Sequence, residues 1–133
     1  MTVKSLDHVN IQTRQVVETA RFFSDVLDLR AGPVFPGADM GAITWMYDAQ
    51  DRPLIHITLP GMTFAEDAER PIGADTGALH QVAFECDGHD AMLARLGGLG
   101  LAFRTRDIAQ IGLRQIFVTD PNGVLLELNY RGG

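Results

Sequence analysis

Residues 79–84 read LHQVAF and residues 6–11 read LDHVNI, so a similar alternation of apolar and polar side chains occurs twice, 73 residues apart. Alternation with a period of two is typical of a β-strand that buries one face. A unit that recurs at a fixed distance along a chain determines its architecture. The two stretches therefore predict two copies of one folding module.

Three further correspondences support this prediction, because they follow in the same order at offsets of 71 or 72 residues. Identity between the two halves is low, so the argument depends on the order of the matches more than on any one of them. They are LDL at 27–29 with LGL at 99–101, Asp48 with Asp120, and LIHIT at 54–58 with LLELN at 125–129.

The sequence between these anchors predicts one helix and four strands in each half. Apolar residues at helical spacing predict a helix over 16–27, and a second helix that follows Asp87, its candidate cap, and ends near residue 96. Period-two patterns and turn-rich boundaries predict the strands. These cover 6–12, 30–35, 42–48 and 53–59 in the first half, and 79–86, 102–106, 112–119 and 124–130 in the second.

The order of elements is therefore βαβββ in both halves. The two modules cover about 4–59 and 78–131, and a connection at 60–77, rich in Pro, Gly and acidic residues, joins them. We expect an α+β fold in which both modules belong to a single domain over 1–133.

Composition excludes several classes of partner. The net charge is −6 and the eleven Lys and Arg residues are scattered, which argues against a nucleic-acid partner. No apolar run approaches the roughly 18 residues of a membrane span, and the first residues lack the apolar stretch of a signal peptide, so we expect no membrane partner and a cytoplasmic protein. With Cys86 as the single cysteine, any metal would be held by nitrogen and oxygen.

The repeat places potential metal ligands at matching positions. His8 matches Gln81, and His56 matches Glu127. Isoleucines flank His56 and leucines flank Glu127, so both polar side chains point away from the face that their neighbours bury. An ionised carboxylate in such a strand is costly unless it is paired, and a divalent cation would pair with it.

Two βαβββ modules, together with LDHV at 6–9, FFSDVLDL at 22–29 and DPNGVLLEL at 120–128, resemble the vicinal oxygen chelate superfamily. This superfamily contains glyoxalase I, methylmalonyl-CoA epimerase, extradiol dioxygenases, and fosfomycin and bleomycin resistance proteins. The resemblance implies that the modules curl their mixed sheets into a metal-binding cup. It also implies one divalent metal ion, held by the residues at four positions: His8, His56, Gln81 and Glu127.

The sequence departs from many members of the superfamily at one of these positions. Where they have a histidine, this register gives Gln81, and His80 falls at the position that matches Asp7. Normal pleating turns Gln81 inward, and His80 would replace it only if a bulge shifted the strand by one residue. Because an amide is a weaker ligand than an imidazole, a site with only the other three ligands is an alternative.

Imidazole and carboxylate ligands suit Zn, Ni, Co, Mn or Fe, and the ligands alone do not choose among them. With open positions, the metal can chelate two adjacent oxygens of a small substrate and stabilise the negative charge of an enolate. The resemblance implies lyase or isomerase chemistry of the glyoxalase type, in which Glu127 acts as base as well as ligand.

Two other functions stay open. Two histidines and a carboxylate also suit an extradiol-type Fe(II) dioxygenase, although ring-cleaving relatives usually have a histidine where this chain has Gln81. The third candidate is binding of a drug or metabolite without chemistry, as in bleomycin resistance proteins.

Other polar residues are candidates for binding a small-molecule substrate. Asn10 and Asn129 have the same strand parity as His8 and Glu127, and Thr58 follows His56 by two residues. On the strand at 112–119, Arg114 is a further candidate, with Gln115 as the alternative to it. The resemblance further implies a homodimer, in which the cup is completed within one chain or by modules of two chains.

Overall fold

The computed structural model describes residues 1–62 and 75–132, and the chain forms two compact units, Met1–Ile72 and Gly73–Gly133. Each unit is described by itself. Most of the predicted connection at 60–77 lies outside the described residues, and the prediction of one domain that contains both modules stays a prediction. None of the described helices is long and apolar enough to cross a membrane.

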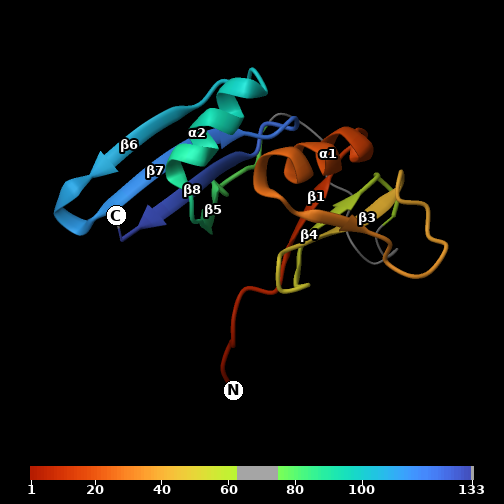
Figure 1. Ribbon diagram of the computed structural model, residues 1–133. Helices are drawn as coiled ribbons and strands as arrows, with labels where there is room; N and C mark the ends of the chain where they lie inside the picture. Colours follow the sequence, from red (N-terminus) through yellow and green to blue (C-terminus); the bar gives the residue numbers. More distant parts are fainter. Residues whose placement is uncertain (63–74, 133) are drawn as a thin grey trace. The chain divides into compact units, whose positions relative to one another are not determined.

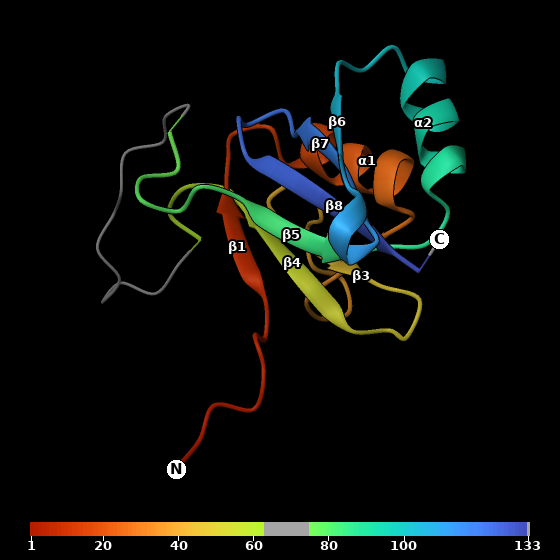
Figure 2. The ribbon, with the colours of Figure 1, turned by 90° about the vertical axis from the view of Figure 1, so that its left-hand side faces the viewer.

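The first unit contains one helix and a four-stranded mixed sheet (Figures 1 and 2). The strand order is β1-β4-β3-β2; β1 and β4 are parallel and the other neighbours are antiparallel. The elements in chain order are β1 (Val9–Gln12), α1 (Val16–Leu27), β2 (Arg30–Gly32), β3 (Ile43–Tyr47) and β4 (Pro53–Thr58).

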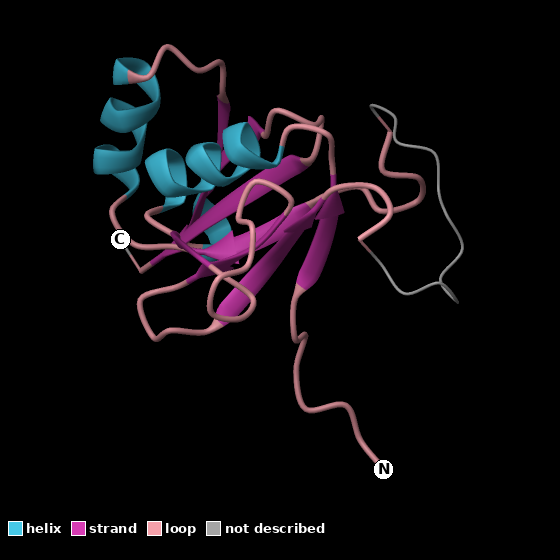
Figure 3. Cartoon of the chain, turned by 90° about the vertical axis from the view of Figure 1, so that its right-hand side faces the viewer, coloured by secondary structure: helices cyan, strands magenta, loops and turns pink. Residues whose placement is uncertain are grey.

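The second unit repeats this arrangement with the strand order β5-β8-β7-β6, in which β5 and β8 are the parallel pair. Figure 3 distinguishes the helices and strands of both units by colour. The elements are β5 (Val82–Glu85), α2 (His89–Gly98), β6 (Arg104–Ile108), a short 3-10 helix (Ala109–Ile111), β7 (Leu113–Thr119) and β8 (Leu125–Arg131). The predicted α+β fold of two βαβββ modules with curled mixed sheets is confirmed.

The turns before the last strands show the repeat at atomic detail. The Oδ1 atom of Asp48 accepts hydrogen bonds from the backbone N–H groups two and four residues later, both at 2.9 Å. Asp120 does the same at 2.8 and 2.9 Å. These backbone donors lower the pKa of Asp48, the one four residues later most strongly. The same side chain therefore builds the same turn in both modules, as the match of the two aspartates predicts.

The cap of α2 differs from the sequence prediction. Asp87 does not cap α2; the cap position is occupied by Gly88, whose φ of 81° lies in the left-handed region. This region is accessible to glycine without a steric penalty, so the backbone itself makes the turn into the helix. Helix α1 ends at Leu27, the residue that the sequence predicts. Asp28 follows it in a left-handed conformation and donates its backbone N–H to carbonyl groups of the last turn, which ends the helix.

Strand alternation determines which side chains are available for a site. In β4, Ile55 and Ile57 are buried, and His56 lies between them with its side chain on the other face. In β8, Leu126 and Leu128 are buried in the same way on either side of Glu127. The last strand of each module thus presents one potential ligand on the face opposite its buried aliphatic residues.

Candidate metal centre

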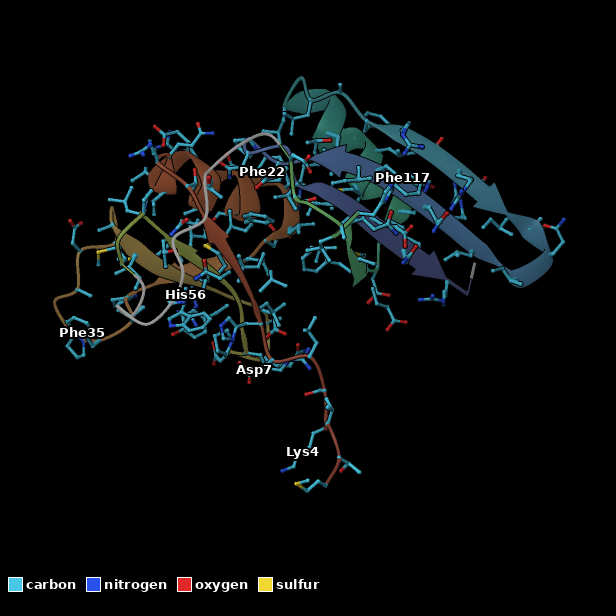
Figure 4. The ribbon with its side chains drawn as sticks, turned by 180° about the vertical axis from the view of Figure 1, so that it is seen from behind. Lys4, Asp7, Phe22, Phe35, His56 and Phe117 are labelled. Atoms are coloured by element: carbon cyan, nitrogen blue, oxygen red, sulfur yellow. The ribbon has the colours of Figure 1, made fainter. Side chains whose placement is uncertain are left out.

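The first unit brings its two predicted ligands together. His56 lies on β4 and is paired with Asn10 of β1, and His8 directly precedes β1. The centroids of the His8 and His56 rings are 6.0 Å apart, with their planes at 76° (Figure 4 labels His56). One imidazole on β4 and one directly before its parallel neighbour β1 therefore lie on the same side of the sheet.

Trp45 completes this cluster. Its ring stacks on His56 with a centroid distance of 4.1 Å and an interplanar angle of 9°, and it contacts the edge of His8 at 4.8 Å. Trp45 lies opposite His56 in the β3–β4 register. The sequence prediction did not include Trp45 in the site, because the contact depends on the register between two strands and not on the pattern within one.

The free nitrogens of the two histidines fit a role in metal binding. The Nε2 atom of His56 is buried and has no hydrogen-bond partner among the described residues. Buried polar atoms are rarely left unpaired, so such an atom suggests an absent ligand. The Nδ1 atom of His8 lies 2.6 Å from Oδ2 of Asp7, as in metal sites where a carboxylate orients the histidine and leaves Nε2 for the ion.

Burial, and to a smaller extent the nearby positive charge of His8, lowers the pKa of His56 below its usual 6.5. Because the unfolded chain then holds this proton more tightly than the folded protein, the contribution of His56 to stability falls as pH drops below 6.5. An NMR titration of metal-free protein should therefore give a midpoint below 6.5 for His56. In His8→Ala the midpoint should move upward, since one source of positive charge is removed. A midpoint at or above 6.5 in the unsubstituted protein would contradict this prediction.

Two of the predicted substrate-binding residues also lie together in the first unit. The hydroxyl of Thr58 donates a hydrogen bond of 3.1 Å to Oδ1 of Asn10, and Thr58 is buried. Asn10 is directly opposite His56 in the register of β1 and β4. These two side chains therefore form a polar pair beside the histidines.

The second unit brings its two predicted ligands into direct contact. The Nε2 atom of Gln81 donates a hydrogen bond of 2.9 Å to Oε1 of Glu127. Asn129 donates a second hydrogen bond, also of 2.9 Å, to Oε2. His80 is exposed and its ring contacts Oε1 of Gln81 at 3.1 Å. Of the adjacent residues His80 and Gln81, it is Gln81 whose side chain is hydrogen-bonded to Glu127. Gln81 directly precedes β5, just as His8 directly precedes β1.

The structure distinguishes between Arg114 and Gln115. Gln115 is buried and donates a hydrogen bond of 3.0 Å to Asn129, on the face that carries Glu127. Arg114 lies on the other face of β7, where it forms ion pairs with Asp90 at 3.6 Å and with Asp107 at 3.8 Å. Arg114 therefore contacts the first turn of α2, on the face of the sheet opposite to the other candidate substrate-binding residues of this unit.

Within the described residues, no three or more His, Cys, Asp or Glu side chains form a group that could hold a metal ion. The four predicted ligands occur as one pair in each unit, His8 with His56 and Gln81 with Glu127. Their assignment to a metal stays a prediction.

Comparison with known proteins gives the family. The family model described as Glyoxalase/Bleomycin resistance protein/Dioxygenase superfamily matches residues 5–128. A comparison of the sequence with curated proteins finds no match.

Solved structures share the fold at low sequence identity. A protein from the mobile metagenome of V. pseudocholerae has a TM-score of 0.75 at 18% identity, over 100% of this chain and 98% of that one. Lactoylglutathione lyase from Agrobacterium tumefaciens has a TM-score of 0.70 at 15% identity, over 97% and 95%. The fosfomycin resistance protein FosX from Listeria monocytogenes has a TM-score of 0.68 at 17% identity, over 98% and 96%. A mutant of that FosX is known as a complex with Mn(II) and 1S,2S-dihydroxypropylphosphonic acid. The chain belongs to the glyoxalase/bleomycin resistance protein/dioxygenase superfamily.

Proposed function

We propose that this protein is an enzyme that depends on one divalent metal ion and carries out lyase or isomerase chemistry on a small oxygenated substrate. Its ligands would be His8, His56, Gln81 and Glu127. The observation that carries the proposal is the buried, unpartnered Nε2 atom of His56 beside the ring of His8. The Mn(II) complex of the FosX mutant supports a metal at this kind of fold.

When bound, the metal would supply a Lewis acid that polarises a substrate oxygen. Glu127 would take a proton from the carbon next to the carbonyl group to which that oxygen belongs. Its two oxygens accept hydrogen bonds from Gln81 and Asn129, which hold the carboxylate in one orientation. Each carboxylate oxygen has a second lone pair, so those bonds leave room for a ligand or a proton. Asn10 and Thr58 would orient the substrate from the side of the histidines.

The contact between Gln81 and Glu127 supports this chemistry over ring cleavage by Fe(II). A site in which Gln81 takes the fourth position has two imidazoles, both from the first unit, and a neutral amide where ring-cleaving relatives have histidine. The amide oxygen is compatible with the redox-inert metals that serve proton transfer.

A metal titration tests the proposal. Trp45 is the single tryptophan and stacks on His56, so its fluorescence should change as Zn(II), Ni(II), Co(II) or Mn(II) is added to chelator-treated protein, with saturation at one equivalent. No saturable change with any of these ions, and no metal retained in dialysis, would overturn the metal-dependent enzyme and favour binding without chemistry. Oxygen uptake with 4-methylcatechol, in the presence of Fe(II) alone, would instead indicate a dioxygenase.

We also propose a cytoplasmic homodimer, for which membership of the superfamily is the support. The metal proposal does not depend on whether the pairs from the two units meet within one chain or between two copies. Sedimentation of the full chain with and without Zn(II) would measure the oligomeric state directly.

A further inference from the structure

A chain of side-chain hydrogen bonds crosses the second sheet and ends on Glu127. The Nε atom of Arg106 donates to Oε1 of Gln115 at 2.7 Å. The Nε2 atom of Gln115 donates to Oδ1 of Asn129 at 3.0 Å, and the Nδ2 atom of Asn129 donates to Oε2 of Glu127 at 2.9 Å. An arginine on β6 is therefore connected to the carboxylate on β8 through two amides.

The backbone register places these groups in line. Arg106 lies opposite Gln115 in the β6–β7 pairing, and Gln115 lies opposite Asn129 in the β7–β8 pairing. Directly paired residues share a face of the sheet, so the three side chains form one row across three strands. Glu127 is two residues from Asn129 along β8 and has the same parity.

The chemistry of the two ends fixes the direction of the chain. A guanidinium has only donors, and an ionised carboxylate has only acceptors. Each amide between them must therefore turn its oxygen toward Arg106 and its NH2 group toward Glu127. Gln115 and Asn129 are buried, with 4% and 8% of their surfaces exposed, and a buried polar group that loses its partner is costly.

We propose that Arg106 is a positioning residue for Glu127, which acts through Gln115 and Asn129 to hold the carboxylate in the orientation that binds metal. This inference rests on the proposed function for the role of Glu127. The hydrogen bonds from Arg106 to Glu127 themselves require no metal. Removing the guanidinium would leave Oε1 of Gln115 unpaired and loosen the amide that positions Asn129. Arg106 does not itself touch Glu127 in this arrangement.

Arg104 provides a matched control. It lies two residues before Arg106 on the same strand and face, and both guanidinium groups lie over the ring of Phe117, at 4.4 Å and 5.4 Å from its centroid (Figure 4 labels Phe117). In the described part of the chain, however, Arg104 forms no side-chain hydrogen bond or ion pair. Arg104→Met thus removes the same charge and a similar contact with Phe117, but leaves the hydrogen bonds between Arg106 and Glu127 in place.

The first experiment uses NMR of metal-free, full-length protein. The side-chain NH2 signals of Gln115 and Asn129 are assigned from Gln115→Leu and Asn129→Leu. In Arg106→Met both signals should move or broaden; in Arg104→Met they should stay in place. Arg106→Lys, which can donate one hydrogen bond to Gln115, should restore part of the original positions. Unchanged signals in Arg106→Met, or equal changes in Arg104→Met, would overturn the hydrogen-bond chain.

The second experiment measures Mn(II) affinity by competition with a chelator. Removing a group that holds a metal ligand in place without touching the metal typically weakens metal binding roughly 10–100-fold. We expect a loss of roughly 10-fold in Arg106→Met and little change in Arg104→Met. Because Gln115→Leu already interrupts the chain, the double variant Arg106→Met/Gln115→Leu should bind no more weakly than Gln115→Leu alone. Additive losses would overturn the positioning role.

The two experiments distinguish an error in the proposed function from an error in the role of Arg106, because only the second experiment requires metal binding. Unsubstituted protein that binds none of Zn(II), Ni(II), Co(II) and Mn(II) would overturn the role of Arg106 in metal binding together with the proposed function. If the protein binds one of the other ions but not Mn(II), the affinities of the variants are compared with that ion. The NMR comparison would still show whether Arg106 orders the two amides, since it is made without metal.

Discussion

Replacing His56 with alanine should abolish stoichiometric retention of divalent metal. Protein purified without chelator is expected to keep about one metal ion per chain, and His56→Ala should keep almost none after the same dialysis. Loss of a group that only holds a ligand in place already weakens metal binding roughly 10–100-fold, so loss of a ligand should weaken it by more than about 100-fold. Metal content by mass spectrometry and chelator competition measure the effect.

His80→Ala is the control for this prediction. His80 is exposed, and its ring contacts Gln81 and not Glu127, so its removal should leave metal content near that of the unsubstituted protein. Gln81→Ala should weaken binding measurably. If His80→Ala lost the metal while Gln81→Ala kept it, the ligand would be His80, as a shifted register requires. Unchanged metal content in His56→Ala would remove His56 from the proposed ligands.

Replacing Phe23 with alanine should give the largest loss of stability in the first unit. Phe23 is 0% exposed and lies on α1, which packs against β2, β3 and β4. Truncation of a buried phenylalanine to alanine costs about 3–5 kcal/mol, because the apolar contacts are lost and a cavity remains. Urea unfolding followed by Trp45 fluorescence reports this loss, since Trp45 lies on β3 of the same unit.

Val17→Ala is the matched control on the same helix. Val17 is 48% exposed, so its truncation removes little buried surface, and alanine has the higher helix propensity. The free energy of unfolding should change by no more than about 0.5 kcal/mol. Similar losses in the two variants would mean that Phe23 is not part of the core that stabilises this unit.

The sequence was informative where a property depends on neighbours along the chain. Alternation within LDHVNI and LIHIT predicted the strands, and in β4 it separated the buried isoleucines from His56. The match of Asp48 with Asp120 predicted equivalent turns, because the hydrogen bonds of each turn are made within five residues. The limits of the strands were less accurate: pairing begins at Val9 and Val82, just after the candidate ligands.

Properties that depend on contacts between strands could not be predicted from the sequence. Arg114 and Gln115 are adjacent, and parity alone says only that they face opposite ways; the register with β8 places Gln115 beside Asn129. Arg106 was not predicted at all, although it occurs in the alternating RTR of 104–106, because that pattern also fits an exposed edge strand.

By itself, then, the sequence determined the two βαβββ modules and their superfamily. The ligand positions that it predicts stay a prediction. Tertiary structure alone decided that Trp45 stacks on His56 and that Arg106 reaches Glu127 through two amides. The reason is physical. Which face a side chain occupies follows from the pleat of its own strand, whereas the group it meets follows from the register between strands, which is set by the whole sheet.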